Sequence, residues 1–454
     1  MAILFIDDMG YGDLSCYGNP SVQTPNIDKL AASGIKFTQF YVNSPICSPS
    51  RVALNTGQYP MRYKIHSYIA SSKQNNRRAM ADFLDPNAPT LARTLQQSGY
   101  ATGHFGKWHM GGGRDLGDVP LPKEYGFDTS LVSFEGIGNR VLFPKDGLCE
   151  ASAKLERGNI IWAEKHKSTS IYVDHALDFI KSSGDKPFYI NICPNDVHDP
   201  HLPESMVLEK WKEVTENPFE QRFFAVLDEM DRQIGRFIDE LDKMGELDNT
   251  LILLASDNGP TDWPFYFNKD RYPEGYEGDM YPPGFAGDFL GRKWSLYEGG
   301  IREPLIASWN GHIPAGSVDS STVVAAFDLF PSICSLLGIQ VPEDLDGTDK
   351  SQALLGNPIS KVPAIKWEYA SNPGGSIQPG TIGNRSPNLA IRDGDWKLLV
   401  NTDSSRIQLF NLKSDPGEQS NLANQEAEIT QQLMEEVINW RKGMPLEMAV
   451  MNME

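Results

Sequence analysis

The sequence lacks a hydrophobic run long enough to cross a membrane, and it is poor in cysteine and in positive charge. A spanning helix needs about 20 consecutive apolar residues, and no stretch of the 454 residues approaches that length. The five cysteines are an odd number without paired spacing, so no disulfide framework is expected. The net charge of -19 disfavours non-specific binding to nucleic acid or anionic lipid. With a mean hydropathy of -0.39, the composition predicts a soluble globular protein.

The chain repeats the order of apolar strand, polar loop and amphipathic helix. Apolar runs predict buried strands at 2–6, 35–42, 100–105, 188–193 and 251–255, and helices are predicted near 25–33, 90–98, 170–182 and 224–241. This alternation is typical of an α/β fold, in which helices cover both faces of a large, mixed, mainly parallel sheet. In such sheets the functional residues gather beyond the carboxyl ends of the strands.

The end of the chain follows a different pattern. After a helix near 329–337 and a connector at about 340–360, shorter strands are predicted at 364–369, 389–392, 396–400 and 407–411, followed by a helix at 427–441. We therefore expect a large α/β domain at 1–345 and a small C-terminal subdomain at 346–454, in which a helix accompanies an antiparallel sheet. The segment 260–292, rich in glycine, proline, aromatic and acidic residues, predicts a long functional loop.

Two acidic pairs directly follow predicted strands. Asp7-Asp8 comes after the first strand, and Asp257-Asn258 comes after the strand at 251–255. Adjacent residues of a strand face opposite ways, so both members of a pair reach one ion only where the strand ends, a turn that the nearby glycines allow. Three carboxylates and an amide make an all-oxygen site suited to Ca²⁺ or Mg²⁺ rather than zinc. The alternative is that these residues only cap strand ends and form turns.

A short stretch at 45–51 places one cysteine between two prolines. In Pro45-Ile46-Cys47-Ser48-Pro49-Ser50-Arg51 a helix is expected to open only after Pro49, because proline disfavours helical geometry in the residue before it. Cys47 would then lie just ahead of a helix N-terminus, where free N–H groups favour anions. Arg51 adds a positive fork that is able to hold an oxyanion. The alternative is a buried structural cysteine beside a proline turn.

Lysine and histidine side chains follow other predicted strands or loops. Lys107 and His109 share a tight loop after 100–105, His198 and His201 lie among prolines after 188–193, and Lys293 precedes the segment 294–304. Taken alone, each lysine is better explained as a solvated loop residue and His109 as a capping histidine. With so many carboxylates in the chain, we expect acid–base work rather than metal binding from the two histidines at 198 and 201.

Several of these stretches, in their order along the chain, resemble the motifs of the formylglycine-dependent (type I) sulfatases of the alkaline-phosphatase-like superfamily. The resemblance runs from Asp7 to about Pro304. It includes Cys-x-Pro-Ser-Arg at 47–51 with Thr56-Gly57, the segment 99–109, His-Leu-Pro at 201–203, and Tyr-Glu-Gly-Gly-Ile-Arg-Glu-Pro at 297–304. It continues more weakly to Asp-Pro-Gly-Glu at 415–418. Asn55 stands where the family usually has an apolar residue, and Phe105 where a smaller one is usual.

This resemblance implies a role for each candidate residue. A maturation enzyme would oxidise Cys47 to formylglycine, whose hydrate attacks sulfur. Calcium would be held by Asp7, Asp8, Asp257, Asn258 and the formylglycine oxygen. The set that contacts the sulfate or the hydrate would be Arg51, Lys107, His109 and Lys293. His201 would protonate the leaving oxygen, with His198 as the less favoured alternative, while Arg302 and Glu303 would be structural, as a buried ion pair.

The resemblance also implies a substrate class and a location. Many bacterial relatives act on carbohydrate sulfates, so a sulfated sugar or glycan is expected, with aryl sulfates as surrogates. Basic residues at 62–78, among them Arg62, His66 and Arg77, would grip a polyanionic sugar if they border the site, although a solvated surface is the simpler interpretation. Most relatives are periplasmic or secreted. This sequence shows no signal peptide before its first strand, and its beginning looks truncated.

Two other functions are compatible with the same residues. A phosphate or phosphonate monoester hydrolase of the superfamily would use the same oxyanion-binding site. A non-catalytic protein could use the metal pocket to hold sulfated glycans, although a complete set of nucleophile, metal ligands and acid argues against it.

Overall fold

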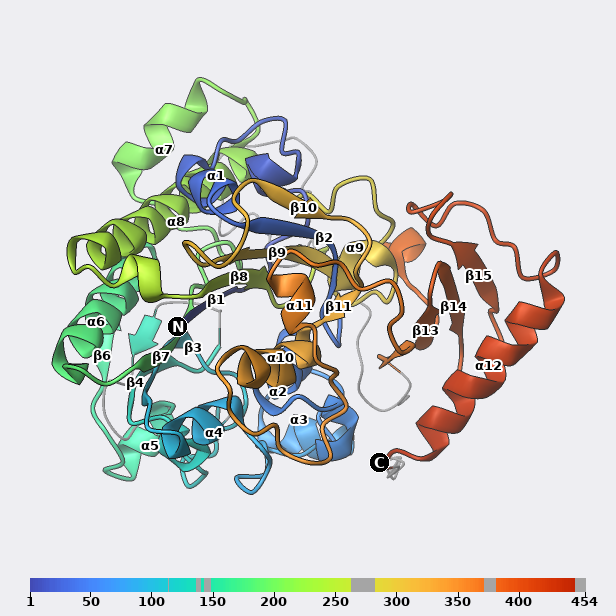
Figure 1. Cartoon of the computed structure of the whole chain (residues 1–454), viewed down its shortest axis with the longest axis horizontal. Helices are drawn as coiled ribbons and strands as arrows, with labels where there is room; N and C mark the ends of the chain where they lie inside the picture. Colours follow the sequence, from blue (N-terminus) through green and yellow to red (C-terminus); the bar gives the residue numbers. More distant parts are fainter. Residues whose placement is uncertain (113, 136–139, 143–147, 263–281, 371–380, 446–454) are drawn as a thin grey trace.

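A large sheet lies at the centre of the computed structural model, which describes residues 1–112, 114–135, 140–142, 148–262, 282–370 and 381–445 (Figure 1). Within these residues it has nine strands in the order β10-β2-β9-β8-β1-β7-β3-β4, with β11 pairing to β2. The strands are β1 (Ala2–Ile6), β2 (Ile35–Tyr41), β3 (Ala101–Lys107), β4 (Thr129–Ser133), β7 (Phe188–Cys193), β8 (Ile252–Ser256), β9 (Arg302–Ser308), β10 (Ser317–Asp319) and β11 (Val324–Ala325). β1 is parallel to β7 and β8, whereas β9 is antiparallel to β8 and β2. The predicted mixed, mainly parallel sheet is confirmed.

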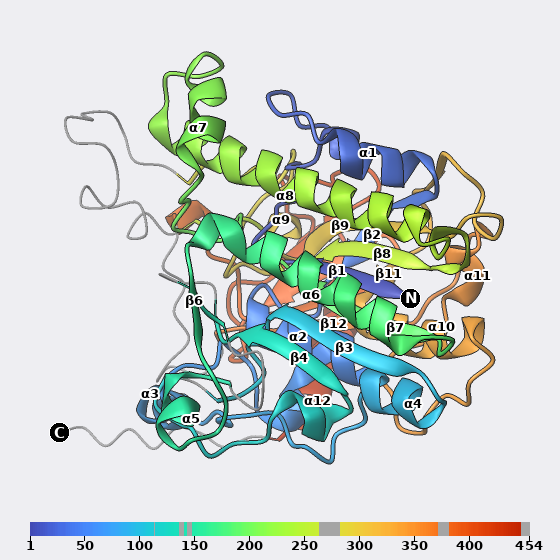
Figure 2. The same cartoon turned by 90° about the vertical axis from the view of Figure 1, so that its left-hand side faces the viewer.

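Helices cover both faces of the sheet (Figures 1 and 2). One face carries α1 (Pro25–Ala32), α6 (Ser168–Ser183) and α8 (Pro218–Lys243), and the other carries α2 (Cys47–Thr56), α4 (Leu91–Gln97) and α10 (Leu329–Leu336). The central strand β1 is buried on both sides, because Leu4 packs in the core with α8 while Ile3 and Phe5 pack in the core with α2 and α4. This two-sided burial explains why β1 is a continuous apolar run rather than an alternating one.

Shorter elements connect these layers. The remaining helices before the C-terminal sheet are α3 (Ser72–Arg77), α5 (Glu150–Lys154), α7 (Ser205–Lys212), α9 (Glu298–Ile301) and α11 (Ser351–Leu354), and β5 (Arg140–Leu142) pairs antiparallel with β6 (Ile161–Ala163). No helix among the described residues combines the length and the apolar character that crossing a membrane would require.

The C-terminal part forms a separate small sheet, seen at the right of Figure 1. Its four strands are β12 (Ile365–Glu368), β13 (Leu389–Asp393), β14 (Trp396–Val400) and β15 (Gln408–Asn411), paired antiparallel in that order, and α12 (Ala427–Lys442) packs on them. Leu433 and Val437 of α12 share a core with Leu389 and Leu398. The predicted antiparallel sheet with a helix is confirmed, whereas the boundary between residues 345 and 346 stays a prediction.

A buried ion cluster joins this small sheet to the large one. Lys397 of β14 is fully buried, and its Nζ lies 2.8 Å from Glu298 Oε1 and 2.9 Å from Glu418 Oε1. The other oxygen of Glu298 accepts a hydrogen bond from the hydroxyl of Tyr41 at 2.5 Å and pairs with Arg302 at 3.3 Å. The expected ion pair between Arg302 and Glu303 is therefore wrong: Arg302 pairs with the residue one helical turn before it.

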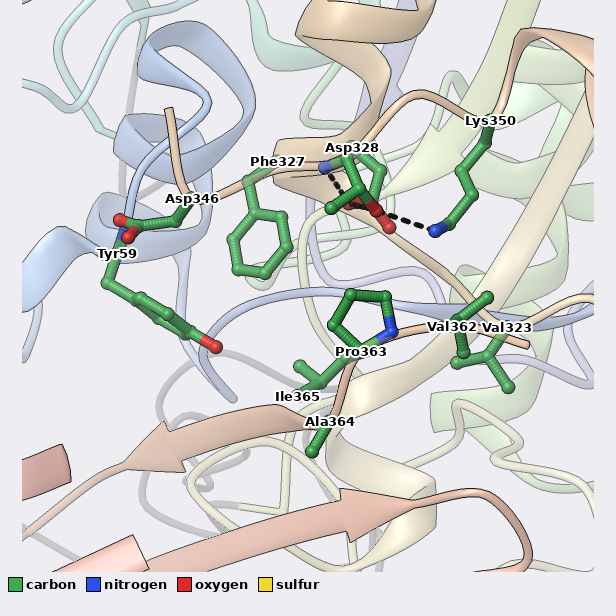
Figure 3. A pocket seen from close by; sticks show the side chains of 11 residues that line it. Tyr59, Val323, Phe327, Asp328, Asp346, Lys350, Val362, Pro363, Ala364 and Ile365 are labelled. Carbon is green, nitrogen blue, oxygen red and sulfur yellow. Dashed lines mark hydrogen bonds between the residues drawn. The ribbon is translucent and has the colours of Figure 1, made fainter. Parts of the chain in front are cut away.

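Where the two parts meet, a cavity of about 30 Å³ lies between Tyr59, Phe327 and the segment 362–365 (Figure 3). Its polar groups already bind one another, because Lys350 Nζ donates to Thr348 Oγ1 at 2.6 Å and the Thr348 N–H donates to Asp328 at 2.7 Å. The residues that line it include none of the predicted site residues. This cavity therefore does not correspond to the predicted site.

One predicted boundary is wrong, and one predicted loop is not tested. Helix α2 begins at Cys47, with Ile46 as its N-cap, rather than after Pro49. Proline is tolerated in the first helical turn because its missing N–H has no intrahelical partner there, so Pro49 continues the turn that Cys47 opens. Most of the predicted functional loop at 260–292 lies outside the described residues, which omit 263–281.

Candidate active site

The predicted site residues come together at the carboxyl ends of adjacent strands. Asp7 and Asp8 follow β1, Asp257 and Asn258 follow its neighbour β8, and Lys107 is the last residue of β3. β1, β7 and β8 are parallel, and β3 is parallel to β7, so these ends meet at one edge of the sheet. Asp8 has a φ of 61°, a left-handed conformation that aspartate tolerates better than most residues. This turn brings both carboxylates of the pair to the same centre.

Three carboxylates and three cations form that centre, and all six side chains are buried. Lys107 Nζ donates to Asp7 Oδ1 at 2.6 Å, and Lys293 Nζ lies 2.6 Å from both oxygens of Asp8. Arg51 donates from Nε and Nη2 to Asp257 Oδ2 at 3.0 and 2.7 Å. Each carboxylate therefore has its own cationic partner, which offsets much of the cost of burying charge.

The pKa values of these acids follow from burial and from their neighbours. Burial opposes the ionisation of Asp7, but the cations Lys107 and Arg51 together hold its pKa well below the usual range. Burial raises the pKa of Asp257 to about 6. The positive charge of Arg51 lowers this pKa, whereas the negative charge of Asp7 raises it further. The opposite shifts of these two pKa values indicate that the nearby cations stabilise the charge of Asp7 more than that of Asp257.

Two oxygen atoms of the centre lack a hydrogen-bond partner among the described residues. They are Asp7 Oδ2 and Asn258 Oδ1, and both are buried. The amide nitrogen of Asn258 donates to Asp8 Oδ1 at 2.8 Å, which fixes the amide with its oxygen turned away from that carboxylate. A buried acceptor without a donor costs about 1–3 kcal/mol, and a hard cation is the partner that such oxygens suit.

Cys47 lies inside this centre rather than ahead of it. It is the first residue of α2, only 3% of its surface is exposed, and its Sγ lies within 4.8 Å of ligand oxygens of both Asp7 and Asp257. Burial raises the pKa of the Cys47 thiol despite the nearby cations Lys107 and Lys293. The unmodified thiol is thus held protonated, which disfavours direct thiolate chemistry.

The three histidines of the prediction occupy different positions. His198 is at the centre, with Nε2 3.4 Å from Lys293 Nζ and 3.5 Å from Asp8 Oδ2. His201 is buried with Nε2 3.0 Å from the Val197 carbonyl oxygen and its ring against Phe223. The ring of His109 has Nε2 3.0 Å from the Ile69 carbonyl oxygen, and its Nδ1 has no hydrogen-bond partner among the described residues.

Burial keeps all three histidines neutral. It lowers the pKa of His201 to about 3, with Lys165 as the next contribution. It lowers the pKa of His198 and His109 well below the usual value, and nearby lysines act in the same direction. A neutral imidazole has one donor and one acceptor nitrogen, so each of these rings can orient a hydroxyl group or accept a proton, and it can protonate a leaving oxygen only after it has itself been protonated.

The basic residues at 62–78 do not join the centre as a group. Arg62 is exposed and pairs with Asp346 at 2.5 Å, and Arg77 is exposed at the end of α3. His66 is buried, with Nε2 3.0 Å from the Arg78 carbonyl oxygen. The two arginines are exposed and His66 is buried, so the three side chains have different surroundings, and their role in gripping a sugar stays a prediction.

The two departures from the family motifs fit the structure. Asn55 donates from its amide to the Arg51 carbonyl oxygen at 2.8 Å within α2, so its polar group has a partner. Phe105 is fully buried against Phe179 on the face covered by α6. Both departures are therefore accommodated by local contacts, and neither one disrupts the arrangement of the candidate site.

Lys165 is a buried residue of this region that the sequence did not single out. Its ammonium group donates to the carbonyl oxygens of His198 and Pro200. It stands in the basic run Lys165-His166-Lys167, which looks like a solvated surface, and no sequence signal marks the first lysine as buried.

Comparisons with known proteins agree with this geometry. Residues 2–339 match the family model described as "Sulfatase", and residues 288–443 match "N-sulphoglucosamine sulphohydrolase, C-terminal". An N-acetylgalactosamine-6-O-sulfatase of Bacteroides thetaiotaomicron is 29% identical over 95% of this chain and 91% of its own length. Human arylsulfatase A is 29% identical over 96% and 85%. The structure of Ps i-CgsB in complex with k-i-k-neocarrahexaose superposes with a TM-score of 0.76 at 26% identity, covering 97% and 92% of the two chains.

Proposed function

The chain belongs to the sulfatase family, the hydrolases of sulfuric esters, and from this premise we propose that it removes sulfate from a carbohydrate. Two relatives support this substrate class, since one is a sulfatase of N-acetylgalactosamine and another is a structure in complex with an oligosaccharide. For the hydrolysis of the sulfate ester itself, the main supporting observation is the convergence of Asp7, Cys47 and Asp257. Their ligand atoms lie within 4.8 Å of one another among buried cations.

We propose that Asp7, Asp8, Asp257 and Asn258 hold a divalent cation, Ca²⁺ or Mg²⁺. All four offer oxygen, the donor that both ions prefer, and the unpartnered Asp7 Oδ2 and Asn258 Oδ1 fit this requirement. The bound cation would supply positive charge beside the sulfate oxygens.

We also propose that a maturation enzyme converts Cys47 to formylglycine, whose hydrate would supply an oxygen nucleophile. Two features support this assignment: Cys47 opens α2 within the centre, and the unmodified thiol is held protonated by burial. The proposal makes Cys47 the catalytic residue and gives His109, with its unpartnered Nδ1, the task of orienting a hydroxyl group of the hydrate.

The chain's own cations would bind the sulfate group. Lys107 and Lys293 hold their positions through Asp7 and Asp8, and Arg51 through Asp257. Preorganised positive charge of this kind is usually the largest contribution to catalysis when negative charge develops in the transition state. His201 remains our prediction for the group that protonates the leaving oxygen, and His198 is the alternative that lies nearer to the centre.

Mass spectrometry of the purified protein tests the modification. Conversion of Cys47 to the aldehyde should leave that residue roughly 18 Da lighter than cysteine. Cys47→Ala should fold and lose essentially all sulfatase activity, while Cys334→Ala, a change of a buried cysteine in α10, should keep it. Near-normal turnover by the Cys47→Ala protein would exclude the formylglycine mechanism.

A pair of histidine variants tests the proton donor. A general acid contributes about 10²–10⁴-fold, and most when the leaving group is poor. His201→Ala should therefore slow a sugar sulfate far more than a nitrophenyl sulfate, and His198→Ala should slow both by similar factors. The reverse result would exchange the two assignments.

Comparing sulfate and phosphate esters on one preparation tests the reaction class. A phosphonate monoester hydrolase of Agrobacterium radiobacter shares the fold at a TM-score of 0.61 and 19% identity, a level that speaks for the fold alone. Faster turnover of the phosphate ester would overturn the proposed substrate, and absence of any turnover together with tight binding of a sulfated glycan would indicate a binding protein.

A further inference from the structure

Lys165 is one of the few lysines buried close to the candidate active site. It begins the short helical turn Lys165–Lys167 directly before α6, and only 3% of its surface is exposed. Its neighbour Lys167 points outward and pairs with Glu164 at the surface. Burying an ammonium group is costly unless it makes hydrogen bonds, so the contacts of Lys165 explain why it is buried.

Both main contacts of Lys165 are carbonyl oxygens of the segment 194–204, which we call the histidine loop. The ammonium donates to the carbonyl oxygen of His198 and, at 2.9 Å, to that of Pro200. These two carbonyl groups lie on either side of Asp199, between the two histidines. We propose that Lys165 is a positioning residue, which fixes the histidine loop so that its imidazole rings face the sulfate site.

A displacement of this loop would act directly on the chemistry. The ring of His198 is 3.4 Å from Lys293 Nζ and 3.5 Å from Asp8 Oδ2, so it touches two members of the centre. His201 follows three residues later and takes its place from the Val197 carbonyl within the same loop. A hydrogen bond from a charged donor is stronger than one from a neutral donor, which suits Lys165 to holding a bend of main chain.

A second contact fixes the same loop from the same side. Thr169, four residues after Lys165 in α6, donates from its hydroxyl to a carboxylate oxygen of Asp196. Thr169 is fully buried. The beginning of α6 thus holds the histidine loop at Asp196, His198 and Pro200, while Lys165 and Thr169 themselves bind no member of the acid–cation centre through the bonds described above.

Lys165→Met tests the proposal, since it keeps most of the length of the side chain and removes the donor. Misplacing a catalytic group by about 1 Å costs on the order of 10²-fold. The variant should lose roughly 10–100-fold in kcat on a sugar sulfate and clearly less on nitrophenyl sulfate, with little change in KM. Lys167→Met, the matched control at the surface, should behave like the wild type on both substrates.

A double-mutant comparison separates positioning from a general loss of stability. A positioning residue acts through another group, so Lys165→Met should lose its leaving-group effect when the acid histidine is already alanine. The same fold-loss from Lys165→Met in the wild type, in His201→Ala and in His198→Ala would overturn the proposal. If Lys165→Met does not fold, Thr169→Val removes the second contact and is expected to give the smaller change of the same kind.

The proposal depends on the proposed acid–base function, and a crystal structure of Lys165→Met distinguishes their failures. If neither histidine variant discriminates between leaving groups, the acid assignment fails. The loop geometry then decides the role of Lys165: a shift of the histidine rings upholds it, and rings that keep their places refute it.

Discussion

Lys397→Met should strongly destabilise the fold, because the single ammonium group of Lys397 pairs with two buried carboxylates. Lys397 Nζ is fully buried between Glu298 and Glu418, at 2.8 and 2.9 Å. In the variant Glu298 keeps Tyr41 and Arg302, while Glu418 keeps the Glu298 N–H at 2.6 Å. Breaking a buried ion pair by removing one partner costs about 3–5 kcal/mol, and we expect a loss in that range near pH 8.

The cost should depend on pH in a stated direction. Burial raises the pKa of Glu418 to about 7, in spite of the neighbouring Lys397. Burial opposes the ionisation of Glu298, but Lys397 and Arg302 hold its pKa at about 2. At pH 5.5 Glu418 is therefore protonated in the folded state, and removing the ammonium leaves a single carboxylate that Arg302 still neutralises. The loss should be clearly smaller at pH 5.5 than at pH 8.

Urea denaturation at these two pH values, with tryptophan fluorescence as the signal, measures the effect. The control is Lys413→Met, a change of an exposed lysine, which should alter the free energy of unfolding by less than about 0.5 kcal/mol. Glu418→Gln, added to Lys397→Met, should recover a large part of the loss because it removes the charge that has no cation. A loss below about 1 kcal/mol at pH 8, or an equal loss at both pH values, would refute this account of the ion cluster.

Three further predictions concern the metal, the guanidinium group of Arg51 and one buried acid outside the site, Glu368. Chelation of the divalent cation should lower the melting temperature and abolish activity, and added calcium should restore both. A cation at 100 times its Kd stabilises the folded protein by about 2.7 kcal/mol, so an unchanged melting curve would contradict the proposed metal site. Arg51→Lys should lower kcat by at least roughly 100-fold in a sulfate-release assay, because lysine cannot replace both hydrogen bonds to Asp257 and still bind sulfate. Burial raises the pKa of Glu368 to about 7 despite Arg441, so this carboxyl contributes stability below pH 4.5 that is lost as the pH rises towards 7. Glu368→Gln should therefore flatten the decline of the unfolding free energy between pH 5 and 7, measured in urea, and an unchanged decline would refute the assignment.

The individual strands and helices were predictable from the sequence where the hydrophobic pattern alone determines them. The apolar run 2–6, followed by Asp7 and Asp8, indicates a buried strand that ends in acidic residues, and β1 has this form. The amphipathic stripe of α8 predicted the longest helix, because the period of 3.6 residues is visible in the sequence. The strand order was not predictable, since no local pattern tells that β1 lies between β7 and β8.

The sequence also could not predict which charged residues of the site pair with one another. It names Lys107, Lys293 and Arg51 as cations, but only the fold pairs them with Asp7, Asp8 and Asp257 respectively. The same limit explains the residues at 62–78, where neighbours in sequence point to different surroundings, and the burial of Lys165, which depends on a loop more than 30 residues away. Residue types indicate which chemistry is available, whereas pairing depends on topology.

If Cys47 is oxidised to formylglycine as proposed above, its burial in the folded protein would set a time limit on that modification. Arg51 of α2 is locked by Asp257, which lies 206 residues later in the chain. At a synthesis rate of about 5–20 residues per second, those residues take on the order of 10–40 s to appear. During that interval Asp257 and β8 have not yet been synthesised, so the folded surroundings that bury Cys47 are incomplete, and a maturation enzyme of the kind proposed would have access to it. Once β8 pairs with β1, 3% of the Cys47 surface remains exposed. A host that synthesises the chain faster than it oxidises the cysteine would accumulate a well-folded protein with a permanently inactive site.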